Sequence, residues 1–330
     1  MNTQLQEKCE LLAFNRSLVK KGFFWEYDLM RTVAAAIYTD ADQTADTNRI
    51  KECRKMLRKR QGIFSDFRSY TELLVSTKMS LKDDPERYLE DVLEVYTSLR
   101  SGKFFTSQYM AHAALNICDL AQGYRTEIIA GRTRELMRGM RSAHPFLTSN
   151  EDMPFASLIA CTEKDTDSLI EEIEACYQLL RSKFALHDDA VYSLAQVLSI
   201  STMEVTPKCQ RVLDIYWALR DRGYKYGKSY ELASLGTLID LPLTADEIAE
   251  EIIDASLYLK TQKGFRGLDM DKRTRLMFAA MLVANVYAPE ESSLSASITS
   301  STVTTAVAEE IAVMIMMMMV STSSSAAASS

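Results

Sequence analysis

The stretch Lys21-Gly22-Phe23-Phe24 decides the fold, because its order of a basic, a small and an aromatic residue returns along the chain. The small residues of successive copies lie 40 or 41 positions apart, at Gly22, Gly62, Gly102, Ser142, Ser182, Gly223 and Gly264. A period of this length is typical of helical-repeat proteins. The sequence therefore predicts seven similar units.

Each copy of this turn motif lies between two patterns that predict helices. Ahead of it, Tyr-x-x-Leu-Arg at 96–100, 177–181 and 216–220 ends stretches whose apolar residues recur every three or four positions. Behind it come apolar runs rich in small residues, such as 33–37 and 111–115. One pair of helices cannot bury its apolar faces alone. We therefore expect an all-α protein, an α-solenoid of about seven two-helix repeats with the first helices outside and the second helices inside.

Local chemistry explains the turn motif. Glycine adopts the left-handed conformation that ends many helices, and a Lys or Arg in the last turn complements the carbonyl end of the helix dipole. We expect the aromatic residue to fold back over the helix pair, so that each turn is the joint of a helical hairpin.

Composition agrees with this fold and excludes several classes of function. The 330 residues include only 11 Gly and 6 Pro, too few for the turns of an all-β protein, and the net charge is −7. The acidic balance disfavours broad nucleic-acid binding, which relies on Lys and Arg contacts to phosphate. No Cys-x-x-Cys pair, signal peptide or run of about 20 apolar residues occurs. We expect a cytoplasmic protein without a transmembrane segment.

Charge alternates between the predicted first helices from the second unit onward. The helix over 47–61 is strongly basic and the helix over 83–100 is acidic. We expect Arg58 and Arg60, with their basic neighbours, to face acidic residues that include Glu90. Each exposed ion pair contributes only about 0–1 kcal/mol, so the alternation favours correct stacking more than stability. This structural interpretation of the basic helix is preferred to a nucleic-acid patch.

The composition changes after Pro289. Residues 291–330 are mostly Ser, Thr and Ala, interrupted by a short apolar, Met-rich helix predicted over 303–320. We therefore divide the chain into a helical-repeat domain, 1–290, and a tail, 291–330. Two interpretations of the tail stay open: a capping helix or mobile segment, and an adaptable Met-rich surface for a partner, a second copy of the chain or a membrane interface.

The second helices line the concave surface of many solenoids, so their polar and aromatic residues are candidates for a binding face. The candidate residues are Tyr27, Arg31, Tyr70, Tyr109, Tyr192 and Tyr230. The competing interpretation is that the tyrosines pack between units with their hydroxyls at the surface. No phosphate-binding loop, metalloprotease motif or nucleophile elbow occurs, so we assign no catalytic residue, cofactor or metal ligand.

An enzymatic alternative rests on two histidines in neighbouring joints between helices. His187 with the two aspartates after it superficially resembles the His-Asp pair of all-helical metal-dependent phosphohydrolases. A metal-dependent hydrolase of this type would use His144, His187 and Asp188. The simpler role for Asp188 or Asp189 is the N-cap of a helix over 190–198.

Four segments resemble a known family. They are KGFFWE at 21–26, GIFSDFR at 62–68, AHPFLT at 143–148 and RLMFAA at 275–280. They are similar to the bacterial domain-of-unknown-function family numbered 4003, and the resemblance covers nearly the whole chain with its Ser/Thr/Ala tail. It implies an all-helical, cytosolic bacterial protein and carries no activity, substrate or catalytic residue.

Together these features predict an interaction protein more than an enzyme. We expect a non-enzymatic scaffold or regulator that binds a peptide or protein on its inner helix face, with the tail as a route to oligomers. The metal-dependent hydrolase is the alternative.

Overall fold

The computed structural model describes residues 1–62, 65–68, 71–101, 106–121, 125–184, 187–267, 269–288, 306–307 and 311. Within these ranges every regular element is a helix, which confirms the all-α prediction. No helix in the same ranges is long and apolar enough to cross a membrane.

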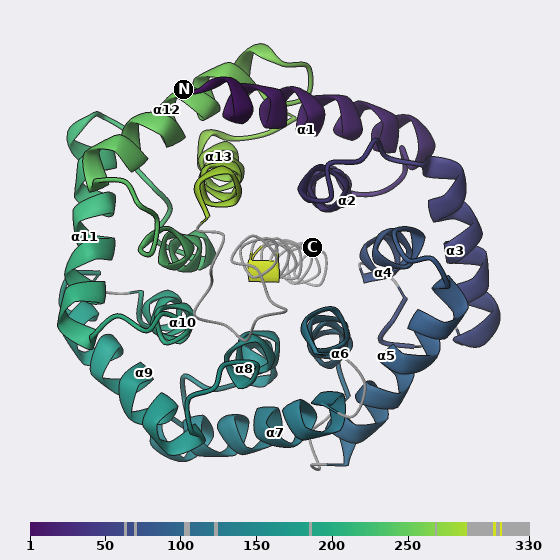
Figure 1. Cartoon of the computed structure of the whole chain (residues 1–330), viewed down its shortest axis with the longest axis horizontal. Helices are drawn as coiled ribbons and strands as arrows, with labels where there is room; N and C mark the ends of the chain where they lie inside the picture. Colours follow the sequence, from purple (N-terminus) through teal and green to yellow (C-terminus); the bar gives the residue numbers. More distant parts are fainter. Residues whose placement is uncertain are drawn as a thin grey trace, which may run out of the picture.

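The described helices form two concentric layers (Figure 1). The outer helices are α1 (Thr3–Gly22), α3 (Thr47–Arg60), α5 (Pro85–Arg100), α7 (Arg125–Ala143), α9 (Thr166–Leu180), α11 (Val205–Asp221) and α12 (Ala245–Thr261). The inner elements are α2 (Asp28–Asp40), α4 (Thr71–Ser80), α6 (Gln108–Leu120), α8 (Met153–Ala160), α10 (Asp188–Leu198), the 3-10 helix η2 (Tyr230–Leu238) and α13 (Lys272–Tyr287). A short 3-10 helix, η1 (Asn150–Asp152), precedes α8. Each outer helix is thus followed by an inner element, as the turn motif predicts.

The two ends of the row of hairpins meet, so the described helices close into a ring (Figure 1). Across the seam between the last and first hairpins, Tyr258 donates to Glu10 (2.6 Å) and Lys20 pairs with Asp269 (3.0 Å). This differs from the open solenoid that we expected, in which the first and last hairpins stay apart. The physical reason is cumulative rotation: each hairpin turns the row by a similar angle, and the last one arrives beside the first.

The apolar core lies between the two layers. Each outer helix is amphipathic and buries one stripe, which on α5 consists of Tyr88, Leu89, Val92, Val95 and Leu99. The inner helices are buried all round, and α8 buries all of its residues. Small side chains let such helices approach closely, which explains the alanine-rich runs, including 34–36 of α2.

The tail residues that the structure describes lie at the centre of the ring, inside the inner helices (Figure 1). Ala306 is 6% exposed, and Val307 and Ile311 are fully buried. The rest of the helix predicted over 303–320 lies outside the described residues. The tail residues that are described therefore lie inside the ring and not at an open end of it.

The expected left-handed glycine is found in some turns only. Gly223 has φ +79° and Gly264 has φ +95°. Gly22 is the last residue of α1 and has no positive φ, and neither does Gly62. At Gly22 the requirement is space instead, because a Cβ there would lie 2.9 Å from the Cβ of Thr47 at the start of α3.

The basic helix α3 pairs with acids mostly in a different place from the one expected. Arg60 does pair with Glu90 of α5. Arg58 instead binds Glu72 of the inner helix α4 through two hydrogen bonds of 2.8 Å, and Arg54 lies 3.3 Å from the same carboxylate. The positive charge of α3 therefore joins the two layers as well as neighbouring outer helices.

Candidate functional site

The carbonyl ends of the inner helices gather at one face of the ring. Carbonyl groups in the last turn of a helix have no partner within the helix, so donors must come from elsewhere. The first half of each outer helix contains one residue of a repeating series. Each member of the series follows the member in the preceding outer helix by 39 to 44 positions. These residues are Lys8, Arg49, Tyr88, Arg132, Glu172, Arg211 and Glu251.

Basic residues in this series bind the carbonyl ends directly. Lys8 donates to the carbonyl of Thr39 (3.0 Å), Arg49 to that of Ser80 (2.7 Å) and Arg132 to that of Thr162 (2.6 Å). Positive charge at a helix carboxyl end also complements the dipole. These three contacts fix α1, α3 and α7 to the ends of their inner partners.

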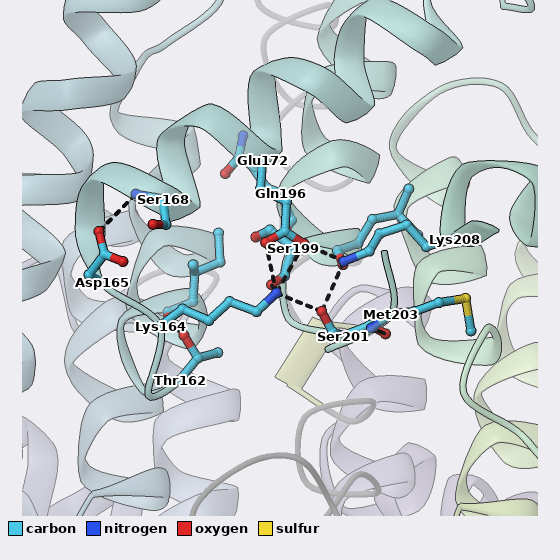
Figure 2. A network of polar contacts seen from close by, with 12 residues as sticks. Thr162, Lys164, Asp165, Ser168, Glu172, Gln196, Ser199, Ser201, Met203 and Lys208 are labelled. Atoms are coloured by element: carbon cyan, nitrogen blue, oxygen red, sulfur yellow. Dashed lines mark hydrogen bonds and ion pairs between the residues drawn. The ribbon is translucent and has the colours of Figure 1, made fainter. Parts of the chain in front are cut away.

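At Glu172 the member of the series is acidic instead of basic. Here two lysines bind the carbonyl end of α10 (Figure 2). Lys164 lies 2.8 Å from the Glu172 carboxylate and donates to the carbonyls of Ser199 (2.9 Å) and Ser201 (2.7 Å). Lys208 is fully buried, pairs with Glu172 and donates to Ser201 (2.9 Å). Both ammonium groups are saturated with acceptors, so this network is a helix cap and leaves no amine free for chemistry.

A cavity of about 420 Å³ opens beside this network, between α9 and the segment that leads into α11. Lys164 and Glu172 form part of its wall together with Glu171, Met203 and Glu204. Its lining contains no nucleophile paired with a base. It is therefore a surface hollow next to a structural ion network.

A second cavity, of about 270 Å³, lies at the mouth of the ring where α2, α4 and α6 end. Its lining residues are Ile37, Asp40, Ala41, Lys78, Leu81, Lys82, Asn116, Asp119, Leu120 and Ala306. The last of these belongs to the tail. The mouth cavity is thus bounded by the inner helices on one side and by the chain's own tail on the other.

Asp119 is the electrostatic centre of the mouth cavity. It lies 2.7 Å from Lys78 and 2.8 Å from Lys82, and the Tyr88 hydroxyl donates to it at 3.0 Å. Burial opposes its ionisation, but the two lysines outweigh burial and lower the pKa of Asp119 to about 2. An aspartate held ionised in this way is a poor proton acceptor near neutral pH. The mouth offers charge and shape for binding more than acid–base catalysis.

The amino ends of the inner elements carry a second series, of which the predicted binding face included only Arg31 and Tyr192. At intervals of 39 to 44 residues each inner element, or the residue just before it, supplies one buried polar side chain. We call these residues the belt. They are Arg31, Glu72, His112, Asp152, Tyr192, Glu231 and Arg275. These polar residues recur with nearly the same period as the glycines and aromatic residues of the turn motif, and that period is the sequence signal for them.

Belt residues hold the turns in place. The Arg31 guanidinium lies 2.6 Å from Asp28 and donates to the carbonyl of Phe24 (2.6 Å). Asp152 accepts from the backbone of Ser149 (2.8 Å) and from Gln196 (2.6 Å). Burial raises the pKa of Asp152 to about 6 against these two hydrogen bonds. Arg31 and Asp152 therefore anchor the turns at the amino ends of α2 and α8.

The residues predicted for the binding face do not form one surface. Tyr27 is half-exposed at the start of α2, whereas Tyr109 on α6 is buried. Tyr192 is buried and packs edge-on against His144. Arg31 is turned toward Asp28, as described above, and Tyr230 begins η2. Tyr70 and the turn glycine Gly102 lie outside the described residues.

Two of the three residues of the enzymatic alternative are linked through a tyrosine. His144 binds Glu174 and packs against Tyr177 with ring centroids 5.2 Å apart, and the Tyr177 hydroxyl donates to Asp188 (3.0 Å). His187 precedes α10 as its N-cap position without a capping side chain, and Asp188 is the first residue of that helix instead of its cap. In the part of the chain that the structure describes, no three His, Cys, Asp or Glu side chains are grouped to hold a metal ion.

Comparison with known proteins places the chain in a family. The family model described as a protein of unknown function (DUF4003) matches residues 15–317, so the chain belongs to this family. The match runs past the ring and includes the tail residues that lie within it. No curated protein and no solved structure matches the chain.

Proposed function

We propose that this member of the DUF4003 family is a non-enzymatic binding protein, a scaffold or regulator, that receives a peptide or protein segment against the inner helices of its ring. The observation that carries the proposal is the burial of Ala306, Val307 and Ile311 in the centre of the ring. A space that accepts one polypeptide segment, with small apolar side chains around it, suits another segment of similar chemistry. In this state Ala306, Val307 and Ile311 of the chain's own tail occupy the space.

The mouth cavity supports the same proposal. It adjoins Ala306, and its wall combines apolar residues with polar ones that include Lys78, Lys82 and Asp119. Binding sites combine apolar area with a few placed polar groups that fix orientation. A bound segment would bury its apolar residues between the inner helices and its polar groups near Asp119.

We further infer that the seven hairpins are repeats of one two-helix unit. The two series of equivalent residues, one at each end of the inner elements, support this interpretation beyond the turn motif itself. In repeat proteins the surface formed by equivalent helices is the usual binding surface, which agrees with a ligand at the centre.

The test uses the full chain and a labelled peptide with the sequence of residues 301–313, which spans the three buried tail residues. Val307→Asp places a carboxylate where the side chain is now fully buried, which expels the tail. We expect the peptide to bind this variant at least tenfold more tightly than it binds the parent, whose centre is occupied. Fluorescence anisotropy measures the binding.

Two controls make the result interpretable. Leu257→Asp introduces the same charge at a half-exposed position of α12 and is expected to bind the peptide as weakly as the parent does. A peptide carrying the Val307→Asp change is expected not to bind. If the folded Val307→Asp protein, checked by circular dichroism, fails to bind the unmodified peptide, the proposal is wrong.

A further inference from the structure

The two faces of the ring differ in charge. Every outer helix ends at the face that carries the turns, and every inner element begins there. In each of the seven turns an exposed basic residue ends the outer helix or follows it closely: Lys21, Arg60, Arg100, Arg141, Arg181, Arg220 and Lys263. We call this surface the turn face.

The opposite face is acidic. The segment that leads from an inner element to the next outer helix, or the first turn of that outer helix, carries an exposed acid. These residues are Asp42, Asp84, Glu127, Asp165, Glu204 and Asp246. An inner helix such as α2, with 13 residues, spans about 20 Å between the faces. The Debye length is about 10 Å at 0.1 M salt, so most acids of the opposite face are screened from a charged surface at the turn face. Asp246 and Glu250 are exceptions, because both pair with Arg222 just after α11. The net charge of −7 therefore does not describe what the turn face presents.

The turn face also carries the most exposed aromatic side chains among the described residues. Phe146 is 99% exposed and Trp25 is 86% exposed, and Trp25 stacks on the half-exposed Phe24 with ring centroids 3.8 Å apart. Trp25 follows α1, whereas Phe146 follows α7 on the other side of the ring (Figure 1). Aromatic rings at the tips of turns are free to contact a surface that covers the turn face.

We propose that the turn face binds the surface of an anionic phospholipid bilayer. Basic residues distributed around a ring match a negatively charged plane, and each contributes when it lies within a Debye length of the lipid headgroups. Exposed aromatic rings at the tips of turns insert at the level of the headgroups, where an amphipathic ring is most stable. Two aromatic contact points on opposite sides of the ring fit a flat partner better than a narrow one such as a nucleic-acid strand.

Flotation with lipid vesicles tests this proposal on the full chain. We expect the protein to float with vesicles that mix phosphatidylcholine and phosphatidylglycerol and not with vesicles of phosphatidylcholine alone. Lys21→Glu, Lys263→Glu and Arg266→Glu together change three exposed cations of the turn face. This triple variant is expected to lower the partition coefficient about a hundredfold, since each cation near the surface contributes about fivefold.

The apolar contribution is tested separately. Trp25→Ala combined with Phe146→Ala leaves the charge unchanged and is expected to lower partitioning about tenfold. Phe14→Ala removes a half-exposed aromatic ring from the middle of α1 and is expected to have no effect. Equal losses from Phe14→Ala would show that the aromatic residues of the turn face have no special role and would contradict the proposal.

A matched charge control completes the experiment. Lys55→Glu, Arg87→Glu and Arg125→Glu change the same number of exposed cations away from the turn face. This control is expected to float like the parent. The proposal is overturned if the parent does not float with anionic vesicles, or if the control loses flotation as fully as the triple variant does. Binding of duplex or single-stranded nucleic acid in place of vesicles, abolished by the triple variant, would assign the turn face to that partner instead.

Discussion

The junction between α9 and α11 and the seam between α12 and α1 join neighbouring hairpins in different ways. At the junction, Glu172 binds two lysines, one of them fully buried, and the chain continues from one hairpin to the next. At the seam no peptide links the hairpins, and the pair Lys20–Asp269 is 44% and 39% exposed. The seam adds Arg16, which is 2% exposed and lies over the ring of Phe265 at 5.2 Å.

The difference teaches where charge carries stability in this ring. A buried ion pair contributes little net stability, but removal of one partner leaves a charge without compensation. An exposed ion pair contributes little net stability, and removal of one of its partners costs little. We therefore expect the junction to be the more sensitive of the two to changes of charge, and the seam to depend on close packing.

The largest effect is expected at the junction. Glu172→Gln keeps the shape of the side chain but leaves the buried Lys208 without a counter-charge, which is expected to lower the free energy of unfolding by about 3–5 kcal/mol. Urea denaturation measures the loss. Glu171→Gln, at the exposed neighbouring position, is expected to change stability by less than about 0.5 kcal/mol. Equal effects would mean that the ion network has no structural role.

Gly264→Ala tests close packing at the seam. Gly264 has φ +95°, and an added Cβ would overlap the guanidinium of Arg16. We expect a loss of about 3 kcal/mol, because backbone strain adds to displacement of Arg16. Gly223→Ala is the matched control, since Gly223 has φ +79° and no atom within 4 Å of the added Cβ. Its expected loss is about 1–2 kcal/mol, and losses of equal size would show that the contact with Arg16 does not matter.

The free energy of unfolding is expected to vary with pH because of Asp152, which lies neither at the junction nor at the seam. Its pKa is about 6 in the folded chain and about 3.9 when unfolded, so the folded state binds the proton more tightly. The stability that this proton adds is fully present below pH 4 and is lost as the pH rises through 6, by about 3 kcal/mol. Asp152→Asn is expected to flatten that part of the curve, because the side-chain carbonyl of Gln196, which has no hydrogen-bond partner among the described residues, can accept from the new amide. An unchanged slope would contradict the assignment.

The smallest effect is expected for the ion pair across the seam. Lys20→Met removes the contact with Asp269 and is expected to lower the free energy of unfolding by about 0–1 kcal/mol, less at high salt. A double-mutant cycle with Asp269→Asn isolates the coupling between the two side chains. A coupling of several kcal/mol would show that ions hold the seam as firmly as they hold the junction.

Much of the fold could be predicted from the sequence, because its signals are local. The turn motif and the apolar periodicity predict the hairpins and the two layers, since a turn is decided by residues within a few positions of it. Closure of the ring could not be predicted in this way. It depends on a small rotation between hairpins summed over the whole chain, and only contacts such as Tyr258–Glu10 reveal it.

The candidate site was less accessible from the sequence. The second helices predict a binding face that includes Tyr192 and Arg31, yet Tyr192 is buried and Arg31 is held by Asp28. What a polar side chain does depends on which neighbour reaches it. Gln196, which binds Asp152, and Glu172, which binds Lys208, each come from another hairpin. The position of Ala306 inside the ring likewise depends on contacts with residues far away in the sequence, which no local pattern predicts.

The seam has a consequence for synthesis on the ribosome. Ribosomes add about 5–20 residues per second, so the first hairpin emerges about 10 to 40 s before α12 and α13 are made. Throughout that interval the surface of α1 that later contacts α12 is exposed to solvent. The incomplete ring therefore has an exposed surface at its N-terminal hairpin. We expect chaperones to engage the translating chain at that surface, and release to follow only when the final hairpin arrives.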